Sequence, residues 1–275
     1  MKYALPVFAI ALMGFPIGFP SAQAAFTAAP HRAIYDLTLL RAGDSANLQS
    51  ATGRLAFELQ GSSCEGYTVS FRMVAKYRAS EGAATLIDTQ STTYEGPGAL
   101  DFRHQVKEMV NGEIKEESKL KVTRAAANQV GKGEITSKVD ESFTVPGEAF
   151  LPMQHQFKLM ALGEAGGGRD SSLIYDGSDG AKTFQAISFV GKTKLPGTIA
   201  RDAAEPSAAS LKTFAAWPVT VSYFSPDKDE STPDYQVSFD LYENGVATGL
   251  VLDYGEFALS GKLADLTLFE TTECP

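Results

Sequence analysis

The chain has 275 residues, of which 33 are acidic and 24 are basic, so its formal charge at neutral pH is −9. An acidic chain without a basic segment has no electrostatic attraction to phosphate, and we therefore expect neither nucleic acid nor anionic lipid head groups as partners. Hydrophobic residues make up 44% of the chain and aromatic residues 10%, which excludes a disordered or collagenous protein and predicts a soluble globular one.

Residues 1–24 have the features of a secretory signal peptide. Lys2 provides the positive start, a long apolar stretch follows, and the sequence Ala-Gln-Ala at 22–24 is a small-x-small cleavage site. A transmembrane anchor is the alternative, but prolines and glycines interrupt the apolar stretch. We expect cleavage after Ala24, which would leave residues 25–275 as a soluble exported chain without a membrane span.

Strand signals dominate the first half of the chain. Runs rich in Ile, Val, Tyr, Phe and Thr are separated by breaks that contain Gly or Ser. These runs predict strands at residues 31–40, 54–60, 67–77 and 85–94. The dipeptide Asn111-Gly112 predicts a hairpin between strands at 101–110 and 113–122, because a tight hairpin turn needs residues that accept positive φ.

Residues 151–163 interrupt this pattern and predict a central helix. Pro152 stands in the first turn, where a helix accepts proline, and unbranched helix formers follow it. Three consecutive glycines at 166–168 predict the exit from the helix.

Four residues of this helix are candidates for lining a ligand site. Met153, Phe157 and Met160 stand at i, i+4 and i+7, on one face, where they could contact an acyl chain or an apolar peptide. His155 lies on the same helix and could titrate near neutral pH. The alternative for all four is an ordinary place in the core.

Strand signals return in the last quarter of the chain. Alternation predicts strands at 219–224 and 237–242, and Asn244-Gly245 predicts a hairpin with a type I′ turn that leads into a strand at 246–254. The run 257–269 adds one or two strands more. Two loops are expected, at 198–216 and 226–234. The second is acidic, but it does not have Gly and Glu at the positions where a calcium-binding loop requires them.

Cys64 and Cys274 are the two cysteines of the chain. In an oxidising compartment such a pair is a disulfide candidate, and two free buried thiols are the alternative. A zinc site is disfavoured because neither cysteine has a second Cys or a His at ligand spacing.

Many sequential strands and one helix predict a large, strongly curved antiparallel sheet around that helix, in a single domain spanning residues 25–275. Curvature hides the sheet edges and gives the apolar face something to bury against. A β-sandwich or a closed barrel is the alternative.

Motifs with a known chemical mechanism are absent from the sequence. There is no His-Glu-x-x-His, Gly-x-Ser-x-Gly, phosphate-binding loop or Cys-x-x-Cys, and the three histidines, His31, His104 and His155, lie far apart in the chain. We therefore predict no catalytic residue, no metal site and no cofactor. A hydrolase that uses His155 with a strand carboxylate is the weakest of the alternatives.

Several short motifs resemble the cell-envelope integrity protein EipB family and follow the family order along nearly the whole mature chain. They are His31-Arg32-Ala33-Ile34-Tyr35-Asp36-Leu37, Cys64-Glu65-Gly66-Tyr67, Leu151-Pro152 followed by His155, Tyr175-Asp176-Gly177-Ser178, Ser222-Tyr223-Phe224, Pro233-x-Tyr235, Glu243-Asn244-Gly245 and the terminal Cys274. The resemblance implies a periplasmic protein of Gram-negative bacteria with a spiralling sheet around a helix and a disulfide between Cys64 and Cys274. It also implies a role in the cell envelope without an established enzymatic activity.

These expectations give two functional hypotheses besides the hydrolase. The first is a non-catalytic periplasmic scaffold or binding protein that supports envelope integrity and has other periplasmic or envelope proteins as partners. The second is a carrier of a hydrophobic ligand in the concavity of the sheet, since the family fold is similar to that of periplasmic lipoprotein carriers.

Overall fold

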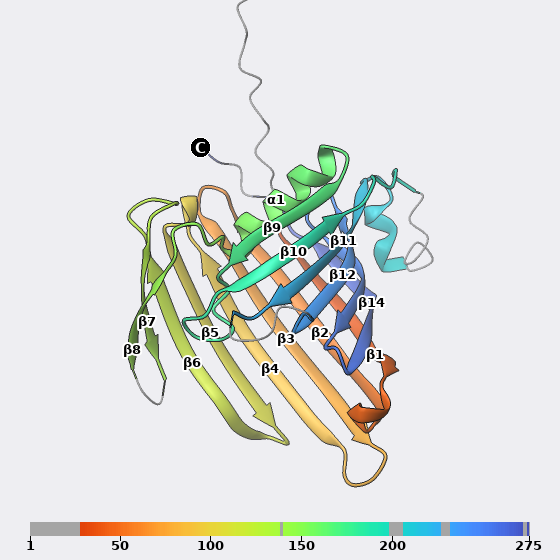
Figure 1. The fold of residues 1–275 in the computed structure, drawn as a ribbon. Coiled ribbons are helices and arrows are strands. Elements are labelled where there is room, and N and C mark those ends of the chain that lie inside the picture. The colour runs from red at the N-terminus through yellow and green to blue at the C-terminus, as the bar shows by residue number, and fades with distance from the viewer. Residues whose placement is uncertain (1–27, 138–139, 198–205, 227–231, 272–273, 275) are drawn as a thin grey trace, which may run out of the picture.

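A single large sheet organises the structure, which is a computed structural model that describes residues 28–137, 140–197, 206–226, 232–271 and 274. Within these residues, fourteen strands form the sheet, in the order β8-β7-β6-β5-β4-β3-β2-β1-β14-β13-β12-β11-β10-β9 (Figure 1). The expected signal peptide lies outside the described residues, and so do parts of the two expected loops, 198–205 and 227–231.

The strands and helices follow one another along the chain with these bounds: β1 (His31–Ala42), η1 (Asp44–Ala46), β2 (Leu48–Ser62), β3 (Gly66–Ala79), β4 (Thr85–Glu95), η2 (Pro97–Ala99), β5 (Asp101–Val110), β6 (Glu113–Thr123), β7 (Gly131–Thr136), β8 (Glu141–Val145), α1 (Pro152–Glu164), β9 (Gly168–Ile174), β10 (Phe184–Val190), η3 (Pro206–Leu211), β11 (Ala216–Phe224), β12 (Tyr235–Tyr242), β13 (Ala247–Asp253) and β14 (Phe257–Leu268).

The first and last strands of the chain are neighbours in the middle of the sheet. β1 pairs antiparallel with β2 on one side and with β14 on the other, so the sheet grows outward in both directions from β1. Its two edges, β8 and β9, are therefore consecutive in the sequence and flank α1. In space, β9 lies beside α1, whereas β8 forms the opposite edge of the sheet, at the left of the view (Figure 1).

The sheet curls around α1 without closing into a barrel. The segment before the helix reaches the edge strand β9 only at Phe150, whose N–H donates to the Leu173 carbonyl over 2.8 Å and whose carbonyl accepts from the Tyr175 N–H over 2.9 Å. The predicted curved, open antiparallel sheet around one helix is thus confirmed.

Alternation explains which face of the sheet is inside. His31, Ala33, Tyr35 and Leu37 of β1 are all buried, whereas the side chains between them are exposed or half-buried. Because successive side chains of a strand point to opposite faces, the sheet turns an apolar face toward α1 and a polar face outward.

The first turn of α1 is bonded to a carboxyl group at the end of β4. Glu95, the last residue of β4, is buried and accepts hydrogen bonds from the backbone N–H groups of Met153 (2.9 Å) and Gln154 (3.2 Å). These N–H groups have no partner within a helix, so the carboxyl oxygens of Glu95 satisfy two donors that would otherwise be unpaired. The predicted helix at 151–163 is confirmed to within one residue at each end.

The two Asn-Gly hairpins are confirmed, but only one has the expected turn. Asn111 (φ 52°) and Gly112 (φ 85°) both have positive φ, as a type I′ turn requires. In the second hairpin only Gly245 has positive φ (85°), and its N–H donates to the Tyr242 carbonyl over 2.8 Å. The type I′ prediction for Asn244-Gly245 was therefore wrong, because the connection is longer than two residues.

Strands β7, β8, β9 and β10 were not predicted from the sequence, and the run 257–269 forms one strand, β14. Gly166 and Gly167 do end the helix, but Gly168 already begins β9. The expected loop 198–216 contains the short helix η3 in its described part.

A disulfide joins Cys64 and Cys274, as the family resemblance implied. It ties the turn between β2 and β3 to the segment that follows β14, across a sequence separation of 210 residues. The alternative of two free thiols is excluded.

Candidate functional site: an apolar hollow inside the curved sheet

A hollow of about 420 Å³, which we call the inner hollow, lies between α1 and the inner face of the sheet. Side chains of β1, β2 and β3 form one wall and those of β11, β12 and β13 form another, while α1 contributes the third. Its apolar surface includes Leu55, Phe71, Leu159, Val221, Phe239 and Leu252. A concave, mostly apolar site with a few polar groups is the usual form of a small-molecule site.

A second hollow of about 390 Å³ adjoins the inner hollow and shares three lining residues with it. Asp176, Tyr223 and Tyr235 line both hollows, and Asp234 and Tyr254 belong to the second alone. The tyrosine rings form a row, with ring centroids 6.0 Å apart between Tyr223 and Tyr235 and 5.1 Å apart between Tyr235 and Tyr254. One end of the combined space is therefore apolar and the other is aromatic and acidic.

Of the four predicted lining residues, the structure places His155 on the inner hollow. Met153 packs in a buried cluster with Leu59 and Tyr67, and Met160 is buried in a cluster with strands β9 to β12. Phe157 stands 5.5 Å from the Tyr67 ring and lines a smaller hollow of about 250 Å³ beside Glu95. A ligand contact for these three residues stays a prediction, whereas the helix residue Leu159, which the sequence did not single out, lines the inner hollow.

His155 lies within a polar cluster that does not have the geometry of a catalytic triad. Its Nε2 is 3.3 Å from the Ser188 hydroxyl and 3.7 Å from the Asp170 carboxylate. In a triad the carboxylate holds Nδ1, so that Nε2 is available to the nucleophile. Here both partners face the same nitrogen, and the Asp170 charge is paired with Lys158 over 2.6 Å.

Burial determines the charge state of the histidines. It lowers the pKa of His155 to about 4, although the nearby Asp170 acts in the opposite direction. Burial also lowers the pKa values of His31 and His104. The structure brings His31 and His155 to the same hollow, where both are neutral at neutral pH, while His104 bonds Thr93 over 2.9 Å elsewhere.

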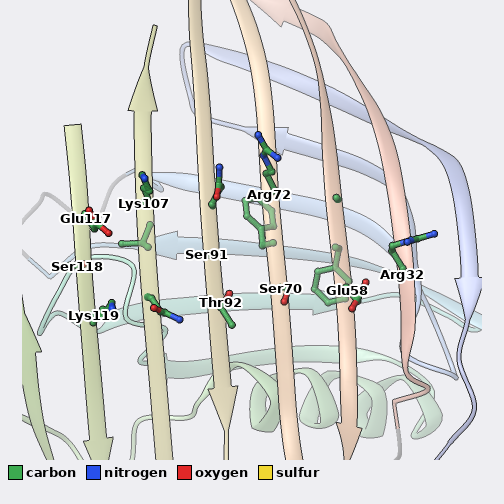
Figure 2. Close-up of a pocket in the computed structure, with 16 residues that line it drawn as sticks. Arg32, Glu58, Ser70, Arg72, Ser91, Thr92, Lys107, Glu117, Ser118 and Lys119 are labelled. Atoms are coloured by element: carbon green, nitrogen blue, oxygen red, sulfur yellow. The ribbon is translucent and has the colours of Figure 1, made fainter. Parts of the chain in front are cut away.

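A third hollow, of about 400 Å³, runs across the outer face of β1 to β6 (Figure 2). Arg32 alternates along β1 with His31, which lines the inner hollow, so the Arg32 side chain points outward. Cations and anions lie opposite each other across the strands, as with Lys107 and Glu117. This outer hollow is open, and three of its four basic side chains have a carboxylate partner: Arg32 lies opposite Glu58, Lys107 opposite Glu117, and Arg72 forms an ion pair with Asp88. It is therefore a weaker candidate than the apolar hollow.

The described residues contain neither a cluster of metal-ligating side chains nor a helix suited to span a membrane. In that part of the chain, no three His, Cys, Asp or Glu side chains gather closely enough to hold a metal ion. Among the helices described, none combines the length and the apolar character that crossing a membrane requires.

Comparison with known proteins decides the family. Residues 22–270 match the family described as EipB-like. The chain belongs to this family. The cell envelope integrity protein EipB of Brucella abortus (strain 2308) is 33% identical over 264 residues, which are 92% of this chain and 89% of that protein.

The EipB-like fold is also seen in a crystal structure. A protein of Brucella abortus, described as a β-barrel-like protein of a domain of unknown function, has a TM-score of 0.82 and 30% identity and covers 88% of this chain and 99% of that chain. The family resemblance noted in the sequence motifs is thus confirmed, and the similarity extends over nearly the whole described fold.

Proposed function

We propose that this protein is a soluble, non-catalytic binding protein of the periplasm that supports the integrity of the cell envelope. The name of its Brucella relative as a cell envelope integrity protein supports the envelope role. The signal-peptide features of residues 1–24 support export, and the disulfide suits an oxidising compartment. Other envelope proteins are its proposed partners.

The single observation that carries the binding function is the apolar hollow between α1 and the sheet. A folded core normally fills such a space with its own side chains, since interiors pack with few voids larger than a water molecule. Here a continuous apolar wall from three parts of the fold surrounds about 420 Å³. A hydrophobic ligand, such as an acyl chain, is the occupant that matches this wall.

Native mass spectrometry of the protein purified from the periplasm tests this function. We expect lipid to copurify, and we expect the delipidated protein to bind an apolar fluorescent probe. Val237→Phe places a larger side chain in the hollow and should abolish the binding of both. The matched control is Gln236→Phe, because Gln236 alternates with Val237 and points to the opposite face of β12.

Failure to detect copurifying lipid, together with no binding of the probe, would contradict the ligand-carrier function. It would leave the scaffold function, which needs no hollow. A scaffold role is tested separately by complementation, where Val237→Phe should then support the envelope as well as the unmodified protein does.

The geometry gives the hydrolase hypothesis little support. Ser188 has no exposed surface, and both it and Asp170 face Nε2 of His155, so a proton relay is not assembled. We expect Ser188→Ala, which removes the hydroxyl that faces His155 without changing the lining of the hollow, to complement as well as the unmodified protein does. Loss of complementation with retained folding would return the hydrolase to consideration.

A further inference from the structure

The inner hollow is chemically asymmetric, and this asymmetry limits the ligands that it can hold. We propose that its ligand is an amphiphile with a cationic head group, whose apolar chain lies against α1 and whose head group lies against Asp176, Tyr223 and Tyr235. This inference rests on the proposed ligand-carrier function and adds the chemical class of the ligand.

Asp176 is the charged group at the junction of the two hollows. Among the described residues that line the inner hollow, it is the one carboxylate, and none is Lys or Arg. The two histidines on this wall, His31 and His155, are neutral at neutral pH because burial lowers their pKa values. A ligand in this space therefore meets a negative charge that no cation of the lining offsets.

The Asp176 carboxylate is held in place but not neutralised. Its Oδ1 accepts hydrogen bonds from the Ser178 N–H over 2.9 Å and from the Ser178 hydroxyl over 2.7 Å. No basic side chain of the described residues forms an ion pair with it. Its second oxygen is thus available for a ligand at the point where the apolar and aromatic walls meet.

The tyrosine row supplies the second attraction for a cation. Burial raises the pKa of Tyr254 to about 12 and raises the pKa values of Tyr223 and Tyr235 as well, so all three hydroxyls stay neutral. Neutral aromatic rings attract cations through their negative faces, and protein sites for quaternary ammonium ligands use aromatic side chains in this way. An anionic head group would gain nothing from these rings and would be repelled by Asp176.

The chemistry of the walls therefore ranks the possible amphiphiles by their expected affinity. An alkylammonium satisfies both ends of the space, an uncharged amphiphile satisfies the apolar end alone, and a fatty acid places a carboxylate beside Asp176. The second hollow agrees with this order, since Phe184 adds a fourth aromatic ring to its lining.

Isothermal titration calorimetry on the delipidated mature protein tests the inference with two amphiphiles of equal chain length, dodecyltrimethylammonium and dodecanoate, below their critical micelle concentrations. We expect the ammonium compound to bind at least about tenfold more tightly, because opposite charges interact more strongly in a partly enclosed site than at an exposed surface. Choline, which has the head group without the chain, should bind far more weakly than dodecyltrimethylammonium.

Asp176→Asn should remove this preference while keeping the size of the side chain. The matched control is Asp179→Asn, which changes the net charge equally but lies on the exposed part of the same turn, 3.1 Å from Lys182. The control should keep the preference, which separates binding in the hollow from general attraction of a cation to an acidic protein.

The outcomes distinguish this inference from the function on which it rests. If neither amphiphile binds, the ligand-carrier function itself is refuted. If both bind equally well, or dodecanoate binds more tightly, the carrier function stands and the cationic head group is refuted. The comparison of ligands on the unmodified protein decides the matter even where Asp176→Asn fails to fold, and choline binding as tightly as the long-chain compound would also refute an amphiphile.

Discussion

Glu95 and His155 are expected to give the protein two opposing responses to pH. Burial raises the pKa of Glu95 to about 7 from an ordinary 4.5, against the opposing effect of the two hydrogen bonds from α1. The folded state therefore holds the Glu95 proton more tightly than the unfolded state does. This contribution to stability is fully present below pH 4.5 and is lost as the pH rises through about 7.

His155 acts in the opposite direction. Burial lowers its pKa to about 4 from an ordinary 6.5, so the folded state holds the proton less tightly than the unfolded state does. Its contribution is present above pH 6.5 and is lost as the pH falls through about 4. His31 and His104, whose pKa values burial also lowers, add to this direction.

The magnitudes of the two main contributions are similar. A shift of one pKa unit corresponds to about 1.4 kcal/mol, so each of the two groups changes the free energy of unfolding by about 3 kcal/mol across its window. Because the windows overlap and the signs are opposite, Glu95 and His155 largely cancel in the unmodified protein. Removal of one group should expose the response of the other.

Urea denaturation of Glu95→Gln and His155→Gln between pH 4.5 and pH 7.5 tests this reasoning. Glu95→Gln carries a constant cost, since an amide nitrogen cannot accept one of the two N–H groups of α1, but its stability relative to the unmodified protein should rise with pH by up to about 3 kcal/mol. His155→Gln should show the reverse slope. The control is Glu113→Gln, whose side chain is 77% exposed and should leave the slope unchanged.

Parallel pH profiles for Glu95→Gln and the unmodified protein would refute the reasoning. They would mean that Glu95 is ionised in the folded state throughout this range, with its two hydrogen bonds and Arg124 outweighing the cost of burial.

Three further predictions concern stability alone and are tested by the same denaturation assay. Reduction of the Cys64–Cys274 bond should lower the free energy of unfolding by at most about 5 kcal/mol, because the bond closes a loop of 210 residues, and equal stability of both forms would contradict a structural role. Gly163→Ala should destabilise by about 1 to 3 kcal/mol despite the higher helix propensity of alanine, because its Cβ would overlap the Trp217 indole, and a stabilised variant would contradict this packing. Gly112→Ala should cost about 1 kcal/mol, because φ is positive although no atom lies within 4 Å of the added Cβ, and an unchanged free energy would contradict the strain.

The sequence predicted most of the sheet because long strands repeat their alternation many times. β1 and β3 have 12 and 14 residues, so an occasional exception does not hide the pattern. The strands that were not predicted, β7 to β10, are short. β9 begins at Gly168 with mostly polar residues, and its pairing with β10 rather than its own propensity makes it a strand. β10 alternates in burial along Phe184–Val190, but Ser188 is buried and Phe189 is exposed, so the apolar residues of its sequence do not follow that alternation.

The central helix was predictable, but its anchor was not. Pro152 and the residues after it indicate where α1 begins, since they act within one turn of the chain. Glu95 lies 58 positions before Met153 and reads locally as the end of a strand. Only the register of the sheet brings its carboxylate to the helix, and no local pattern contains that register.

The inner hollow could not be predicted from the sequence either, because its residues come from distant parts of the chain. The alternation of Val221 and Tyr223 indicates that they share a face, and Asp176 reads as a turn residue after a short strand. What makes them a site is that β11 and the segment after β9 meet inside the curl, opposite Leu55 of β2. Their meeting depends on how far the sheet curves, and that is set by all fourteen strands together. A chemical preference for a cation therefore arises from residues that, taken singly, predict only a strand, a turn and a core.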